Sequence, residues 1–144
     1  MSFKDKLRIK ALELAREFME KISQQKIKVR SIVLFGSYVR GDFTENSDID
    51  ICLIGENLPS DELERRSMRG FYSAPKLSVI AYTPDEFLTM LKDLNPVVMD
   101  IVHEGLALFD DGFFDEARQL FRELQKKYSI IRDGKAWRWR QEAY

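Results

Sequence analysis

The chain has 144 residues, of which 44% are hydrophobic and 33% charged, and its net charge at pH 7 is -1. This length suits one domain with one core, and the near-zero charge excludes a global attraction to nucleic acid or to a membrane surface. The single cysteine, Cys52, excludes an internal disulfide, and no apolar run approaches the ~20 residues that span a bilayer. Because the N-terminus also lacks an apolar signal core, we expect a cytoplasmic location.

The first half of the chain predicts helices and two buried strands. Apolar residues within Leu7–Ile22 recur at spacings of three and four, which predicts an amphipathic helix that packs on a sheet. The segments Val29–Phe35 and Asp48–Ile54 are short, apolar and rich in β-branched residues, so each predicts a strand. A charged segment, Asp61–Arg69, predicts a further helix.

The second half predicts one strand, Lys76–Thr83, followed by helices. A helix begins directly after this strand, because Thr83 suits the N-cap, Pro84 the first helical position and Glu86 the return contact of a capping box. The remaining elements are the continuation of this helix to Leu94, a helix over Pro96–Glu104, a short edge strand over Leu106–Phe109 and a last helix after Gly112.

These elements predict a small α/β (α+β) protein with a mixed sheet of about three to five strands and helices mainly on one face. We expect a domain over residues 1–111 and a C-terminal extension over residues 112–144, made of a helix and a basic, aromatic tail. Trp137 and Trp139 in this tail could stack on nucleic-acid bases. Aromatic residues near a terminus more often dock on their own domain or on a second copy in a homo-oligomer, which is the interpretation we favour.

Two aspartates lie at the start of the second predicted strand. Asp48 and Asp50 are two residues apart, so their carboxylates point to one face of the strand. Two carboxylates this close repel each other, and the usual remedies are protonation, a basic partner or a metal ion. Magnesium fits, because it is commonly held by one or two carboxylates together with substrate phosphates.

A turn with the composition of a phosphate-binding loop follows the first predicted strand. Gly36 permits a close backbone approach, and backbone N–H groups together with the Ser37 hydroxyl suit an anion. Arg40 adds a group for charge-assisted contacts. Each half of this pattern is common by itself, but a strand, Gly-Ser, ten residues and then Asp-x-Asp form a restrictive combination.

The segment "GSYVRGDFTENSDIDICL" resembles the signature of the DNA polymerase beta-like nucleotidyltransferase superfamily, and more narrowly that of the minimal nucleotidyltransferases. The matching positions are Gly36, Ser37, Arg40, Gly41, Ser47, Asp48 and Asp50, with Val39 at the usual alanine. The resemblance extends more loosely from the first helix to about residue 111. It implies the fold of that superfamily.

The resemblance also implies an activity and its site residues. Gly36 and Ser37, with Arg40 and Ser47, would bind the nucleotide, and Asp48 and Asp50 would be the catalytic residues that hold two Mg2+ ions. The reaction implied is transfer of a nucleoside monophosphate, AMP from ATP, to a hydroxyl. The acceptor implied is either a HEPN-type helical protein, with this chain as its antitoxin, or a small molecule.

One position departs from the family pattern. These enzymes carry a third acidic residue on the next strand, and alignment on "YTPDEF" places Ser78 there. A serine cannot accept a proton as a carboxylate does. Either another acidic residue, such as Asp85, Glu86 or Asp100, reaches the site, or the chain is a weakened nucleotide-binding module that regulates a partner by contact.

The remaining reactive side chains stay outside the predicted site. His103, the only histidine, is interpreted as a capping or partly buried structural residue. Cys52 shares a strand face with the aspartates, but we interpret it as a small hydrophobic core residue.

Overall fold

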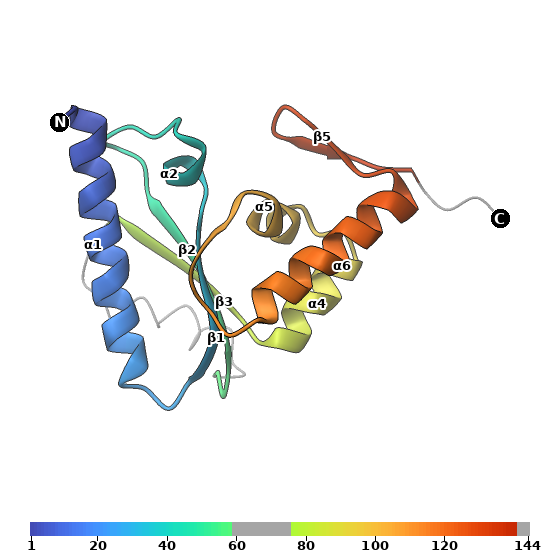
Figure 1. The fold of residues 1–144 in the computed structure, drawn as a ribbon, viewed down its shortest axis with the longest axis horizontal. Helices are drawn as coiled ribbons and strands as arrows, with labels where there is room; N and C mark the ends of the chain where they lie inside the picture. Colours follow the sequence, from blue (N-terminus) through green and yellow to red (C-terminus); the bar gives the residue numbers. More distant parts are fainter. Residues whose placement is uncertain (59–75, 141–144) are drawn as a thin grey trace.

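The computed structural model describes residues 1–58 and 76–140, in which a sheet lies between two layers of helices (Figure 1). The helix predicted over Asp61–Arg69 falls outside the described residues. In chain order the elements are α1 (Phe3–Ser23), β1 (Lys28–Phe35), α2 (Ser37–Arg40), β2 (Ile49–Glu56), β3 (Leu77–Tyr82), α4 (Pro84–Lys92), α5 (Pro96–Glu104), β4 (Leu106–Asp110), α6 (Phe113–Tyr128), β5 (Ile131–Asp133) and β6 (Ala136–Arg138).

The main sheet has the order β3-β2-β1-β4. Strand β1 is antiparallel to β2 and β4, and β2 is parallel to β3, which confirms the predicted mixed sheet. The two central strands, β1 and β2, carry continuous buried runs, as expected for strands covered on both faces.

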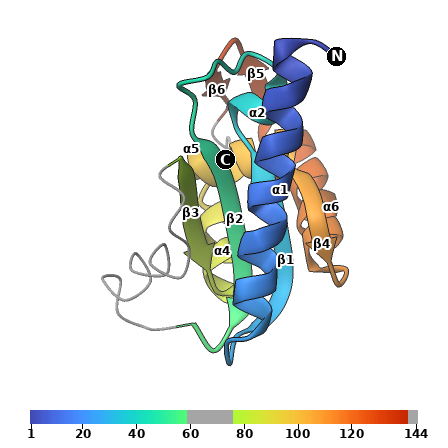
Figure 2. The same cartoon turned by 90° about the vertical axis from the view of Figure 1, so that its left-hand side faces the viewer.

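Helices cover both faces of this sheet, with three on one side. Strand alternation sends Ile49, Ile51 and Leu53 into the cluster formed with α1, and Cys52 and Ile54 into the cluster formed with α4, α5 and α6. Figures 1 and 2 show α1 across one face and α4, α5 and α6 against the other. The short α2 belongs to the α1 side, since its Tyr38 lies in that cluster.

The long α1 buries the stripe that its sequence predicts. Ala11, Ala15, Phe18 and Ile22 face the sheet, while the charged residues between them face outward. No helix in residues 1–58 or 76–140 is both long and apolar enough to cross a membrane.

The predicted helix starts in the second half are confirmed. Thr83 and Glu86 form the reciprocal capping box of α4, with Pro84 at its first position. Asn95 accepts backbone hydrogen bonds at the start of α5, before Pro96. Helix α4 ends at Lys92, two residues before the predicted Leu94.

The C-terminal segment packs on the domain. Helix α6 contributes to the same apolar cluster as α4 and α5, and β5 and β6 form a hairpin. On that hairpin Trp137 donates a 2.8 Å hydrogen bond from Nε1 to Asp100 and packs edge-on against Phe121. Trp137 therefore docks on its own domain, as we expected, whereas the division into residues 1–111 and 112–144 stays a prediction.

Asp110, at the end of β4, holds the start of α6. Its carboxylate accepts hydrogen bonds from the backbone N–H groups of Gly112, Phe114 and Asp115 and from the Ser31 hydroxyl. Burial by itself would raise the pKa of Asp110, but these hydrogen bonds outweigh it and hold the pKa below its usual value. The carboxylate therefore links the sheet to the last helix.

Replacing this carboxylate is expected to weaken the fold. Asp110→Ala should lower the free energy of unfolding by about 2 kcal/mol, measured by urea denaturation at pH 7, because it removes a helix cap and leaves Ser31 without its partner. Since the folded-state pKa is lowered, the stabilisation is present above about pH 4 and is lost as the pH falls. Asp133→Ala, at an exposed hairpin position, is the matched control and should change little. Equal denaturation midpoints for Asp110→Ala and wild type would contradict the assignment.

Candidate active site

The Gly-Ser turn joins the end of β1 to the single turn of α2. Gly36 has a φ of 82°, a conformation that favours glycine, and its carbonyl accepts hydrogen bonds from the N–H groups of Val39 and Arg40. Tyr38 stacks on Phe43 with ring centroids 4.3 Å apart, which anchors the loop to the α1 side of the sheet. The hydrogen bonds to Gly36 and the stack of Tyr38 on Phe43 thus hold the turn in place.

The two aspartates lie on the strand beside this turn. Asp50 pairs with Phe35, the last residue of β1, and Asp48 stands just before β2. Asp48 is exposed, whereas Asp50 is half-buried. Burial, then the negative charge of Asp48, raises the pKa of Asp50 to about 6, and Arg40 opposes this rise. Such a carboxylate pair gains from a bound cation.

Gly36 is in contact with the Asp50 carboxylate. A Cβ built on Gly36 would overlap Oδ2 of Asp50, so only a glycine lets the turn and the carboxylate approach this closely. The Gly-Ser turn and the Asp-x-Asp pair are separate in the sequence. In the structure they are therefore in contact. A triphosphate held by the turn would lie directly beside the carboxylates.

Arg40 is oriented by an acidic residue that the sequence did not single out. Its Nη1 donates to both oxygens of Glu104, at 3.0 and 3.1 Å, and its Nε donates to Asp42 at 3.4 Å. Glu104 is in the last turn of α5, and its side chain is only 8% exposed. Its negative charge also contributes to the raised pKa of Asp50. The only signal in the sequence was an acidic residue directly before Gly105.

Ser47 closes the loop that leads into the aspartates. Its hydroxyl accepts a 2.9 Å hydrogen bond from the N–H of Thr44, and its own N–H donates to the Thr44 carbonyl. Lys76, just before β3, donates from Nζ to the Glu45 carbonyl in the same loop. Both side chains thus hold the loop, and contact of Ser47 with a nucleotide stays a prediction.

Ser78 lies directly beside Asp50. In the parallel pairing of β2 and β3 the partner of Asp50 is Ser78, and that of Cys52 is Ile80. Register partners in a sheet share a face, so the Ser78 hydroxyl is on the face of the two aspartates. The position for which the resemblance predicts a third carboxylate therefore lies beside Asp50 in the fold.

The alternative acidic residues are placed elsewhere. Asp85 and Glu86 follow the far end of β3, where Glu86 caps α4. Asp100 is engaged by Trp137 and by Arg132, whose Nη1 lies 3.4 Å from it. None of these three residues supplies a third carboxylate beside Asp50.

The residues present suit a divalent cation that completes its coordination with other ligands. Within residues 1–58 and 76–140 no group of three or more His, Cys, Asp or Glu side chains is arranged to hold a metal ion. Asp48 and Asp50 supply carboxylate oxygens, and burial together with the charge of Asp48 raises the pKa of Asp50 more than Arg40 lowers it. Magnesium needs no more protein ligands than this when water and phosphates fill the remaining positions.

Comparison with known proteins agrees with this geometry. A proposed protein adenylyltransferase of Methanocaldococcus jannaschii is 57% identical over 107 residues, which cover 69% of this chain and 75% of the relative. A toxin–antitoxin structure with AMP-PNP has a TM-score of 0.54 at 22% identity, covering 78% of this chain and 90% of that chain.

A further structural match extends this comparison. The structure of a tri-AMPylated HEPN toxin from Shewanella oneidensis in complex with an MNT antitoxin has a TM-score of 0.51 at 19% identity, covering 81% of this chain and 90% of that chain. At these identities the two structural matches show the fold. The chain itself matches the nucleotidyltransferase domain family over residues 12–132, and it belongs to that family.

Proposed function

We propose that this protein transfers AMP from ATP to a hydroxyl of a HEPN-type partner protein and acts as the antitoxin of that pair. The observation that carries the proposal is the contact between Gly36 and the Asp50 carboxylate, because it brings a turn that suits a phosphate next to a carboxylate pair that suits a metal ion. The adenylyltransferase relative and the toxin–antitoxin structure with AMP-PNP support this acceptor class and this nucleotide. Since ATP is the donor, we propose that the reaction takes place in the cytoplasm.

Each residue of the site has a distinct part in this reaction. The turn at Gly36 and Ser37 would hold the triphosphate through backbone N–H groups, and Arg40 would place a positive charge beside it. Asp48 and Asp50 would hold up to two magnesium ions. Bound there, magnesium would polarise the α-phosphate and offset the charge that develops during transfer.

The transfer forms one bond and breaks one. The acceptor oxygen bonds to the α-phosphorus, the bond from that phosphorus to the bridging oxygen of the β-phosphate breaks, and pyrophosphate leaves. The acceptor hydroxyl must also lose its proton. At Ser78, the position beside Asp50, no carboxylate is available to receive it.

A labelling experiment tests the proposal. The protein is incubated with ATP labelled at the α-phosphate, magnesium and the HEPN-type protein encoded beside it. We expect label on the partner, and none when Asp48→Asn replaces the wild type. Label that persists in Asp48→Asn would remove this site from the mechanism, and no label on a partner that binds the protein would contradict the function.

Ser78 favours a second candidate function. A nucleotidyltransferase domain with Ser78 at the third-carboxylate position could bind nucleotide and magnesium and regulate its partner by contact. Calorimetry with ATP and magnesium, compared with the labelling experiment, separates the two functions. Binding without transfer would support the contact regulator, and transfer would exclude it.

A further inference from the structure

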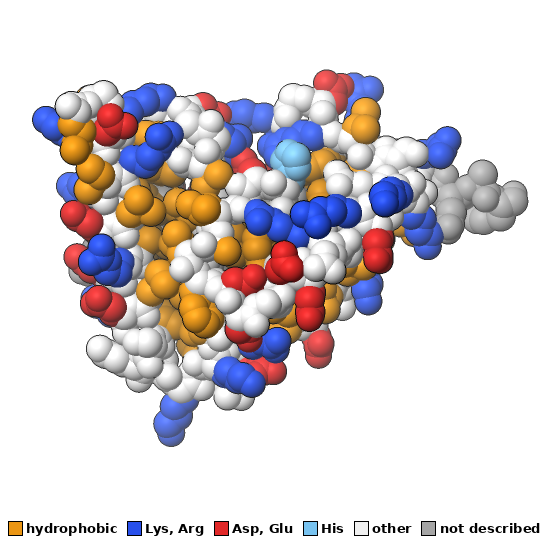
Figure 3. Space-filling model, viewed as in Figure 1, with side chains coloured by type: hydrophobic (Ala, Val, Ile, Leu, Met, Phe, Trp, Pro, Cys, Tyr) orange, Lys and Arg blue, Asp and Glu red, His pale blue; other side chains and the backbone are white. Residues whose placement is uncertain are grey.

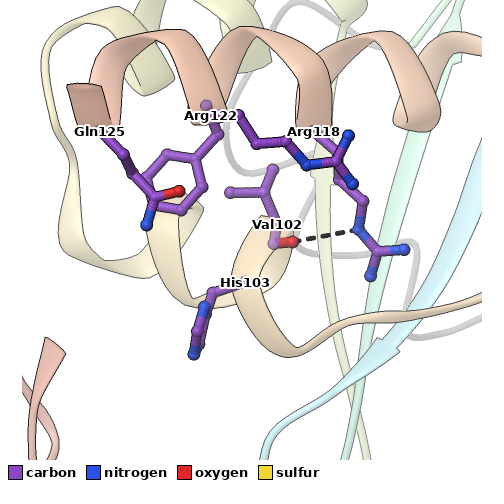
Figure 4. Close-up of a pocket in the computed structure, with 6 residues that line it drawn as sticks. Val102, His103, Arg118, Arg122 and Gln125 are labelled. Atoms are coloured by element: carbon purple, nitrogen blue, oxygen red, sulfur yellow. Dashed lines mark hydrogen bonds between the residues drawn. The ribbon is translucent and has the colours of Figure 1, made fainter. Parts of the chain in front are cut away.

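A pocket of about 250 Å³ lies between α5 and α6, open on one side. Its lining comes from the last turn of α5 and from successive turns of α6, and consists of Val102, His103, Arg118, Phe121, Arg122 and Gln125. Figure 4 shows Arg118 and Arg122 extending from neighbouring turns of α6 on the same side of the helix. Figure 3 shows basic side chains around the single histidine.

The charge of this pocket is positive and not compensated within it. None of its lining residues is acidic. Arg118 donates from Nε to the Val102 carbonyl at 3.1 Å and from Nη2 to the Gly105 carbonyl, so it holds the end of α5. Arg122 is exposed and makes no hydrogen bond or ion pair with another described residue. No described residue therefore occupies the donors of its guanidinium.

The chemistry of this lining selects an anion, and a phosphate in particular. Guanidinium groups bind phosphate oxygens with paired hydrogen bonds, and a histidine and a glutamine add further donors. Phe121 and Val102 give the pocket an apolar floor. With its volume, the pocket has room for a phosphate group and part of the molecule that carries it.

The last turn of α5 contributes one residue to the pocket and the next residue to the contacts of the transfer site. His103 lines the pocket, and the next residue, Glu104, holds Arg40 beside the Asp50 carboxylate. His103 is exposed and packs edge-on against Trp137, with centroids 5.3 Å apart, so the expectation of a partly buried residue is wrong. The exposed imidazole lines the open pocket.

We propose that this pocket is a second phosphate site, which binds the phosphate group of a nucleoside monophosphate or of pyrophosphate. Its part in the reaction rests on the proposed function: the pocket would hold either the AMP group or the pyrophosphate that forms when ATP is split at the transfer site. Binding of a phosphate group in the pocket does not rest on the proposed function, because none of the residues that line the pocket holds the metal or the triphosphate of the transfer site. Arg122 provides a guanidinium that has no hydrogen-bond or ion-pair partner among residues 1–58 and 76–140, and His103 and Gln125 add further donors.

The single histidine gives a direct measurement of this binding. The imidazole proton resonances of His103 are followed by NMR while pyrophosphate, or in a separate arm AMP, is added at low salt and constant pH with EDTA present. Without metal ions the carboxylates of the transfer site repel both probes. We expect a saturable shift of the His103 resonances with at least one probe, and the probe that binds more tightly identifies which half of ATP the pocket takes.

Two variants with the same loss of charge make the test specific. Arg122→Gln should weaken binding about tenfold, the value of one charged hydrogen bond. Lys126→Gln, one turn further along α6 and outside the pocket, should change the affinity less than about twofold. Both positions are exposed, and circular dichroism should show unchanged folding.

The outcomes are distinct. No shift of the His103 resonances with either probe up to about 10 mM, or an equal affinity in Arg122→Gln and Lys126→Gln, would overturn the phosphate site. The titration uses no metal and measures no transfer, so its failure leaves the proposed function untouched. Conversely, a failed labelling experiment leaves the measured affinity of the pocket standing.

Discussion

Asp50→Asn is expected to abolish nucleotide transfer while raising the melting temperature of the metal-free protein at pH 7. Loss of one metal-holding carboxylate should slow transfer about a thousandfold, because it removes several kcal/mol of charge stabilisation. Stability should rise because asparagine has the shape of aspartate without its charge. The half-buried carboxylate beside Asp48 is a cost that the folded protein bears in the absence of a cation.

The pH dependence follows from the raised pKa. In the folded protein the pKa of Asp50 rises from 3.8 to about 6, so the folded state holds the proton more tightly than the unfolded state. The contribution of Asp50 to the stability of the wild type is therefore fully present below about pH 4 and is lost as the pH rises through about 6. The full shift corresponds to about 3 kcal/mol, and solvent screening of this partly open carboxyl reduces the expected gain of Asp50→Asn to about 1 kcal/mol.

Thermal denaturation across this pH range is the measurement, with and without magnesium. Asp93→Asn, which makes the same chemical change at an exposed position after α4, should leave transfer and stability nearly unchanged. Magnesium should raise the melting temperature of the wild type and have less effect on Asp50→Asn. A variant that is less stable than the wild type at pH 7, or that transfers AMP as fast as the wild type, would contradict the role given to this carboxylate.

Ser78→Asp is expected to raise the rate of AMP transfer about a hundredfold. The register of β2 and β3 places this position beside Asp50, so the new carboxylate would stand where the acceptor hydroxyl must lose its proton. General base catalysis by a placed carboxylate contributes at least about a hundredfold. The same charge should lower stability without magnesium, because a third negative group would join Asp48 and Asp50.

Single-turnover measurements with labelled ATP compare this variant with Ser78→Asn, which has nearly the same size but no charge. We expect the gain only for the aspartate. A wild type without measurable transfer and an active Ser78→Asp would support the contact regulator as the natural function. Equal rates for Ser78→Asp and Ser78→Asn would show that the residue beside Asp50 does not limit the reaction.

Local sequence patterns predicted most of the secondary structure. The capping box at Thr83 and Glu86, the proline at the first position of α5 and the apolar stripe of α1 all act over a few residues, so their effect can be read without the fold. The predicted end of α4 lies two residues after the end that the structure shows. Helix ends depend on which side chains are buried nearby, and Leu94 is buried after the helix with a φ of 59°.

Contacts between distant segments required the tertiary structure. Arg40 and Glu104 are 64 residues apart, and nothing local connects the end of the Gly-Ser loop to the end of α5. The sequence also offered Asp85, Glu86 and Asp100 as substitutes for a third carboxylate. The structure places Asp85 and Glu86 beyond the far end of β3, and the contacts of Glu86 and Asp100 show that these two residues hold the helix cap and the hairpin.

The sequence by itself determined the family, the glycine turn and the two aspartates, because these depend on residue type at a fixed spacing along neighbouring strands. The tertiary structure decided that Gly36 touches Asp50, that Ser78 lies beside it, that Glu104 binds Arg40 and that α5 and α6 together line a basic pocket. The physical reason is that chain spacing fixes which face of a strand or helix a side chain occupies. Which faces meet is fixed only when the sheet and its helices bury their apolar surfaces together.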